Sequence, residues 1–291
     1  LPGISNPLPL TGILFGILIH AGSSVLVGAI GWNFGLRPFT CIVAGILYAL
    51  YPLAQFMSVQ LLDITPAIFL FLLSIWVLTH PWKRSGMGWS APALSGLCLG
   101  LAILVRPHFL PVGLVAPFLL LFLRTGSQSR SPRLPAALSM ALSLLLVLLA
   151  QGLYNRAAND DFRILPWQGS YNLWAANKPG ANGLYFFQTV DVSGRGSHGN
   201  PTRVESEMLY AKAFPDQEPP FDPDRMNRHW RSLFLQQIVE NPAQVAGLWL
   251  RKAYAVLNSF EQYNNFTFSF HRERLPALKF NPLHWGLLLI L

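Results

Sequence analysis

Charged residues are scarce in this sequence. Of its 291 residues only 12% are Asp, Glu, Lys or Arg, which is about half of the share typical of a soluble domain, whereas 52% are hydrophobic. Acidic residues are scarcest in residues 1–154, where Asp63 is the single acid beside seven Lys or Arg residues. Long uncharged apolar runs exclude an ordinary soluble domain for this region and predict an integral membrane protein.

Cysteine is also scarce. Cys41 and Cys98 are the two cysteines, and both lie inside apolar runs without metal-ligand spacing. We interpret them as small buried hydrophobic residues. The net charge is +8, but the basic residues form no concentrated patch interleaved with aromatic ones, which argues against nucleic acid as a partner. No resident cofactor or metal centre is predicted, and a divalent cation stays an open alternative.

Six apolar runs in residues 1–154 are predicted to be membrane-crossing helices. Their approximate ranges are 10–30, 38–56, 64–79, 92–105, 108–123 and 135–154. The fourth run is short for a full crossing and is expected to tilt or to extend into a neighbouring loop. Residues 281–291 are interpreted as the start of a further transmembrane helix that the sequence cuts short. We therefore expect the chain to be a piece of a longer protein.

The basic residues between the runs give the predicted helices an orientation. Three alternate loops carry Lys or Arg and no acid: Arg37 in the first, Lys83 and Arg84 in the second, and Arg124, Arg130 and Arg133 in the third. Because the cytoplasmic loops of membrane proteins collect positive charge, these three loops are predicted to be cytoplasmic. Asp63, the turn at Arg106–His108 and the stretch 155–280 then share the extracytoplasmic side.

Residues 155–280 are predicted to form one extracytoplasmic domain with a mixed α/β or irregular fold. The stretch is rich in Asn, Gly, Pro, Asp and Arg and contains enough aromatic residues for a small core. A helix is predicted over about 223–240, with Asp222 as its N-cap. A second is predicted over about 242–259, with an apolar pattern typical of a helix on a membrane surface. Its apolar face is Val245, Leu248, Trp249, Tyr254 and Val256, with Arg251 and Lys252 nearby.

Several segments together resemble one family of membrane enzymes. The motifs are Gly31-Trp32-Asn33-Phe34-Gly35-Leu36-Arg37, Tyr51-Pro52, Leu61-Leu62-Asp63-Ile64-Thr65-Pro66, the Gly-rich stretch 96–108 that ends in Val105-Arg106-Pro107-His108, the stretch 169–185, Asn241-Pro242, Arg251-Lys252 and the stretch 258–265. In this order they resemble bacterial membrane glycosyltransferases of the GT-C fold, in particular glycosyltransferase family 39, which includes protein O-mannosyltransferases and aminoarabinose transferases. The resemblance covers residues 30–265 approximately.

This resemblance implies a GT-C-like helix bundle in a bacterial inner (plasma) membrane. It also implies an enzyme that transfers a sugar from a polyprenyl-phosphate donor to a protein, lipid or glycan acceptor on the extracytoplasmic face. Such a transfer needs a carboxylate to deprotonate the acceptor hydroxyl and a cation to stabilise the leaving phosphate. The family's acid, an Asp often followed by Glu, has no match here, so we expect the catalytic acid upstream of Leu1. A piece that is inactive alone stays an alternative.

Arg106 and His108 are the predicted donor-phosphate residues. They follow the fourth run at its outer end, and a guanidinium binds phosphate through its planar fork. The alternative is an interfacial arginine that reaches lipid headgroups, beside a structural histidine. Asp63 is predicted to pair with Arg106, to contact the acceptor or to help to hold a divalent cation. Its alternative role is the N-cap of the third run.

The other predicted contacts to the acceptor or the sugar lie in the polar stretch 155–280. They are Asn177, Lys178, Asn182, Tyr185, Glu261 and Asn264. Asn side chains and aromatic faces suit sugar recognition, while plain turn chemistry and a solvated loop are the alternatives. Two other functions stay open. One is an envelope polysaccharide polymerase or ligase, and the other is a transporter, although the sequence shows no internal repeat and no matched pair of broken helices.

Overall fold

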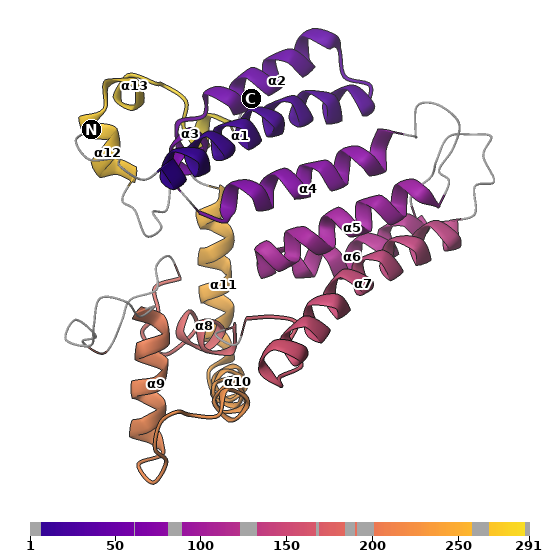
Figure 1. The fold of residues 1–291 in the computed structure, drawn as a ribbon. Helices are drawn as coiled ribbons and strands as arrows, with labels where there is room; N and C mark the ends of the chain where they lie inside the picture. The colour runs from indigo at the N-terminus through magenta and orange to yellow at the C-terminus, as the bar shows by residue number, and fades with distance from the viewer. Residues whose placement is uncertain are drawn as a thin grey trace. The chain divides into compact units, whose positions relative to one another are not determined.

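The computed structural model describes residues 7–60, 62–80, 89–122, 133–166, 169–183, 190, 201–257 and 268–288. Every regular element within these ranges is a helix (Figure 1). The chain divides into two compact units. Unit 1 comprises Leu1–Ile164 and Phe266–His284, and unit 2 comprises Leu165–Asn265 and Trp285–Leu291. The all-α prediction is therefore confirmed for the described residues, and those of the polar stretch contain no strand that would support a mixed α/β fold.

The helices of unit 1 are mostly apolar. They are α1 (Pro7–Asn33), α2 (Pro38–Leu50), α3 (Pro52–Val59), α4 (Ile64–Thr79), α5 (Ser90–Val105), the 3₁₀ turn η2 (Pro107–Phe109), α6 (Leu110–Phe122), α7 (Arg133–Asn159), α12 (Phe268–Arg274) and α13 (Pro276–Lys279). The helix α4 coincides with the predicted run 64–79. The predicted run 38–56 is instead two helices, α2 and α3, bent by 54°.

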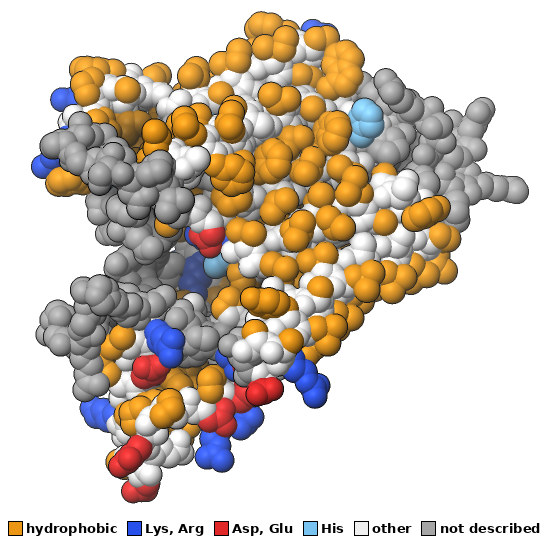
Figure 2. All heavy atoms as spheres, viewed as in Figure 1, with side chains coloured by type: hydrophobic (Ala, Val, Ile, Leu, Met, Phe, Trp, Pro, Cys, Tyr) orange, Lys and Arg blue, Asp and Glu red, His pale blue; other side chains and the backbone are white. Residues whose placement is uncertain are grey.

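Neighbouring helices of unit 1 pack in the order α2, α1, α4, α5 and α7, with α6 against α7 (Figure 1). Much of the surface of these helices is hydrophobic (Figure 2). Two helices, α1 and α7, are long and apolar enough to cross a membrane, and the bent pair α2–α3 is a third candidate. The helices α4, α5 and α6 are apolar but shorter. These two or three candidate spans suggest a membrane protein, and the six passes stay a prediction.

Small residues let the helices of unit 1 approach closely. A Cβ atom at Gly96 of α5 would lie 2.2 Å from the backbone oxygen of Met140 in α7. The helices α4 and α5 are joined by Ser74 and Ser95, whose hydroxyl oxygens lie 2.9 Å apart. In lipid, where burial of apolar surface does not drive helices together, such close contacts and interhelical hydrogen bonds are the main source of association.

The break between α2 and α3 occurs at a proline. Pro52 has no backbone N–H, and it disfavours helical geometry at Tyr51, which is extended with φ −65° and ψ 114°. Side chains donate to the carbonyl oxygens that the break leaves without a helical partner. The Ala49 oxygen accepts from Gln55 Nε2 (2.9 Å) and His20 Nε2 (3.1 Å), and the Leu50 oxygen accepts from Asn281 Nδ2 (2.7 Å). Groups of the protein itself therefore satisfy the irregular backbone at this point.

Unit 2 contains α8 (Gly169–Ala175), α9 (Pro201–Ala213), α10 (Pro223–Glu240), α11 (Pro242–Leu257) and α14 (Trp285–Leu288). Its core is aromatic, with Tyr171, Tyr210 and Trp230 almost fully buried. The predicted N-cap of α10 is confirmed, because Asp222 Oδ1 accepts hydrogen bonds from the backbone N–H groups of Asp224 (2.8 Å) and Arg225 (3.4 Å). The helix predicted over 242–259 is α11.

Candidate functional site

The predicted donor-phosphate residue lies where α5 ends. Arg106 has left the helix, with φ −139° and ψ 105°, because the following residue, Pro107, disfavours helical geometry in its neighbour. The turn η2 that follows is held against α4 by the stacked rings of Phe109 and Phe71, 4.8 Å apart. The backbone thus turns at Arg106 while remaining packed on α4.

Asp63 lies at the same end of unit 1, because α4 and α5 are antiparallel neighbours and it directly precedes α4. Its Oδ1 atom accepts hydrogen bonds from Arg106 Nη2 at 2.8 Å and Arg106 Nε at 3.2 Å. Asp63 occupies the N-cap position of α4 but caps no backbone N–H with its side chain. The expected N-cap position is therefore correct, but the side chain makes no capping hydrogen bond and pairs with Arg106 instead.

The ion pair remains open to solvent. The Arg106 side chain is 23% exposed and the Asp63 side chain 52%. Both donors of Arg106 contact the same carboxylate oxygen, so within the described residues Nη1 of Arg106 and Oδ2 of Asp63 have no hydrogen-bond partner. An exposed pair of this kind stabilises a fold by at most about 1 kcal/mol. Its main physical effect is to hold the Arg106 guanidinium in one position while Nη1 makes no bond to Asp63.

Two other features extend this end of unit 1. His108, in η2, is exposed. A hydrophobic cluster of Phe56, Met57, Phe268 and Leu278 brings α12 and α13 to α3, and Leu62 and Ile64, the residues that flank Asp63, pack against that cluster.

Helix α12 thereby adds basic side chains near the start of α4. They are His271, Arg272 and Arg274. The His271 ring lies 5.1 Å from the Phe56 ring. Sequence reasoning missed this contribution, although the basic run His-Arg-Glu-Arg at 271–274 was a readable signal.

In unit 2, the predicted sugar contact Asn177 is buried and fully engaged. Its Nδ2 donates to the Leu173 carbonyl at 2.7 Å. Its Oδ1 accepts from Lys252 Nζ at 2.8 Å and from Trp249 Nε1 at 3.2 Å. Asn177 therefore joins the end of α8 to α11. Its role in sugar recognition stays a prediction.

Lys178, beside it, is also buried, with 5% of its surface exposed. Burial lowers the pKa of Lys178, and the opposite charge of Glu205 on α9 partly restores it. Burial, with a further contribution from the Glu205 charge, raises the pKa of Tyr171, and burial lowers the pKa of Lys252. Lys178, Glu205 and Tyr171 thus form a buried polar cluster in unit 2. Sequence reasoning found Lys178 alone, because Tyr171 and Glu205 lie on two other elements, α8 and α9.

The remaining predicted contacts are Asn182, which is exposed, and Tyr185, Glu261 and Asn264, which lie outside the described residues. Among the residues that the structure describes, no group of three or more His, Cys, Asp or Glu side chains is arranged to hold a metal ion. A divalent cation at Asp63 therefore stays a prediction.

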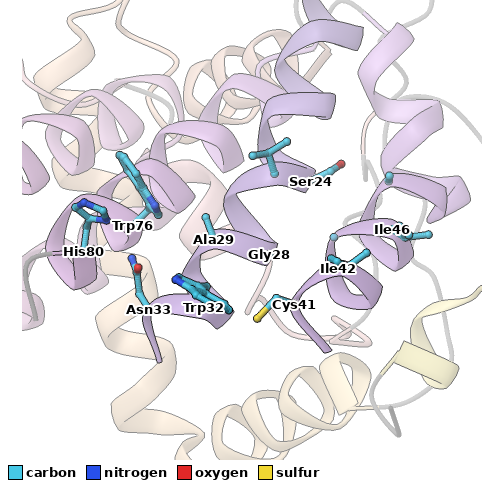
Figure 3. Close-up of a pocket in the computed structure, with 13 residues that line it drawn as sticks. Ser24, Gly28, Ala29, Trp32, Asn33, Cys41, Ile42, Ile46, Trp76 and His80 are labelled. Carbon is cyan, nitrogen blue, oxygen red and sulfur yellow. The ribbon is translucent and has the colours of Figure 1, made fainter. Parts of the chain in front are cut away.

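An apolar pocket of about 650 Å³ lies between α1, α2 and α4 (Figure 3). Its lining includes Ser24, Trp32, Asn33, Cys41, Trp76 and His80. Since His80 follows α4 and Asp63 precedes it, this pocket lies at the end of unit 1 opposite to the ion pair. The pocket is therefore separate from the ion pair. Few polar groups line it, and one of them, Asn33 Nδ2, is already engaged as a donor to Thr79 Oγ1 at 3.1 Å.

Comparison of the chain with family models, curated proteins and solved structures gives no match. The Asp63–Arg106 pair and the motifs around it are therefore the features from which a function can be inferred.

Proposed function

We propose that this chain is part of an integral membrane glycosyltransferase that transfers a sugar from a polyprenyl-phosphate donor to a protein, lipid or glycan acceptor. The observation that supports this proposal best is the Asp63–Arg106 pair. It is a polar, solvent-accessible group at the end of two apolar helices, α4 and α5. A lipid-linked phosphate also combines an apolar part and a charged part, since its tail needs an apolar environment and its phosphate needs a cation at the membrane boundary.

In this proposal Arg106 holds the donor phosphate. A fixed guanidinium offers planar donors to phosphate oxygens and stabilises the charge that develops as the phosphate leaves. Asp63 is a positioning residue, because it contacts Arg106 through one oxygen and leaves Nη1 directed elsewhere. His108 can donate a second hydrogen bond from the next turn. In the proposal the transfer takes place on the extracytoplasmic face of a bacterial inner membrane, and a carboxylate deprotonates the acceptor.

A transporter is the second candidate, and the bend between α2 and α3 favours it. Discontinuous helices build the substrate sites of many transporters, usually in matching positions of two repeats. The described residues contain one bent pair. A transporter would move its substrate without forming a glycosidic bond, so a transfer assay separates the two functions. An envelope polysaccharide polymerase or ligase would also form glycosidic bonds and differs in its acceptor.

The direct test uses the full-length protein in membranes and a labelled polyprenyl-phosphate sugar. Arg106→Ala is expected to lower the transfer rate by about 100-fold, the typical effect of losing one charge-stabilising donor. Arg106→Lys should retain part of the rate, because it keeps the charge and loses the fork. Arg133→Ala, which removes an exposed arginine at the start of α7, is the matched control. Full transfer in both Arg106 variants would exclude the phosphate role.

A further inference from the structure

We infer that α11 is an interfacial helix whose exposed face inserts into the headgroup region of a phospholipid bilayer that contains anionic lipid. This inference concerns a surface of unit 2 and does not depend on glycosyl transfer. It starts from the exposed residues of α11, which include Trp249 (52% exposed), Leu250 (72%), Tyr254 (69%), Val256 (61%) and Leu257 (71%). Leu250, Tyr254 and Leu257 are four and three residues apart, which places these three side chains on one side of the helix.

The structure separates two apolar faces that the sequence pattern had merged. Val245 and Leu248 are 2% and 3% exposed and face the interior of unit 2. Trp249, Tyr254 and Val256 are exposed, although the sequence pattern placed them on the same face. A helix with one apolar face in the core needs no second one for folding, and a large exposed apolar patch usually marks an interaction surface.

The exposed face cannot rotate inward, because the opposite side of α11 is anchored. Lys252 Nζ donates to the Ala176 carbonyl at 3.1 Å and to Asn177 Oδ1 at 2.8 Å. Gly183, with φ +80°, brings the turn after α8 against the backbone of Leu248, where an added Cβ would lie 3.3 Å from the carbonyl oxygen. The Asn177 contacts described above thus have a structural consequence, since they fix which face of α11 is exposed.

Two observations identify the partner as a bilayer. Arg251 is the exposed charged residue of α11, and the helix has no acid, so the charge of its exposed surface complements anionic headgroups. The C-terminal part of α11 is also joined to the start of the last apolar run, because Trp285 Nε1 donates to the Val256 carbonyl at 2.7 Å. That run reads Trp-Gly-Leu-Leu-Leu-Ile-Leu. Amphipathic helices with aromatic and basic residues at these positions are typical of membrane surfaces.

Site-directed spin labelling of the full chain in lipid nanodiscs tests this inference. Cys41 and Cys98 are replaced by alanine, and single cysteines are introduced as Leu250→Cys, Tyr254→Cys or Leu257→Cys. Collision with oxygen, which dissolves in lipid, is compared with collision with a nickel chelate, which dissolves in water. We expect oxygen to be favoured several-fold at these three positions. The control is Gln244→Cys, an exposed polar position in the first turn of the same helix, where the chelate should be favoured.

Two results would overturn the inference. If the chelate is favoured at all positions, the face lies in water. If both reagents are excluded at all three apolar positions, another protein covers the face. A second variant provides an independent check: Leu250→Glu with Leu257→Glu should move the label at position 254 into water, and an unchanged label would contradict insertion. Both positions are exposed, so this variant leaves the core of unit 2 intact.

The lipid charge is tested with nanodiscs of phosphatidylcholine alone and with added phosphatidylglycerol. The anionic lipid should move the label at position 254 deeper, and Arg251→Gln should reduce this difference. Equal depth in the two compositions would overturn the assignment of anionic headgroups.

Discussion

The two units of this protein use polar side chains in opposite ways. In unit 1 the notable ion pair, Asp63 with Arg106, is partly exposed at the end of apolar helices. In unit 2 the charged groups Glu205 and Lys178 are buried among aromatic side chains, with 0% and 5% of their surface exposed. A buried charge must be compensated by the fold, whereas an exposed pair contributes little to stability and remains accessible to a ligand. The contrast predicts which cluster supports structure and which supports function.

The largest effect on stability is expected from Glu205→Ala. This change removes the carboxylate that acts on Lys178 and Tyr171 and leaves a buried ammonium group uncompensated, which costs about 3–5 kcal/mol. The measurement is the unfolding of the full chain in detergent, monitored by the rate at which a protease cleaves unit 2. Glu207→Ala on the same helix is the matched control, because its ion pair with Arg203 is exposed and its loss should cost less than about 1 kcal/mol. Equal effects would contradict a structural role for the buried cluster.

The next effect concerns helix contact in unit 1. Gly96→Ala would place a Cβ 2.2 Å from the Met140 carbonyl oxygen, so α5 and α7 must move apart at a cost of about 1–3 kcal/mol. Gly247→Ala in α11 has open space around the added methyl group and should stabilise its helix by about 0.5–1 kcal/mol. Thermal unfolding of both variants checks the opposite signs. A stabilised Gly96→Ala protein would show that the contact is looser than described.

A smaller change in stability is expected for Asp63→Asn, at most about 1 kcal/mol, because the pair is exposed. If Asp63 positions Arg106, the same variant should lower sugar transfer, although less than Arg106→Ala does. Substitution of Asp63 is therefore expected to lower sugar transfer with little change in stability. Substitution of Glu205 is expected to lower both, because unfolding of the protein also abolishes its activity. An Asp63→Asn protein that unfolds as readily as Glu205→Ala would remove the distinction between the clusters.

The smallest effect is a pH dependence of unit 2. His229 packs edge-on against the rings of Tyr210, Phe214 and Trp230, and burial lowers its pKa below the ordinary 6.5. The unfolded chain therefore takes up a proton at a higher pH than the folded chain. Stability contributed by neutral His229 is present above pH 6.5 and is lost as the pH falls below it.

Unfolding at a series of pH values would measure this loss. His229→Phe keeps the aromatic packing, and its stability should fall less steeply between pH 7.5 and pH 5.5 than that of the original protein. Parallel pH profiles would contradict the shift.

Local features of the structure were predictable because neighbouring residues determine them. Pro52, Pro107, Pro223 and Pro242 mark where helices break or begin, and Asp222 caps α10 as expected. The bend at Pro52 was missed within the predicted run 38–56, since hydropathy alone does not record where backbone hydrogen bonds stop. The Asp63–Arg106 pair was one of several predicted roles for Asp63. Two consecutive antiparallel helices bring the start of one to the end of the other, which makes such a contact accessible to sequence reasoning.

The sequence by itself determined the apolar helices, their proline breaks and the candidate cation at the end of the fourth run, because hydropathy and backbone sterics act over a few residues. Tertiary structure alone decided the contacts between distant segments. Asn177 joins Lys252 across 75 positions, and α12 returns to Phe56. It also decided which apolar face of α11 is buried. A periodic pattern shows that a helix has apolar residues on a side, but burial depends on which surface the rest of the chain offers to that side.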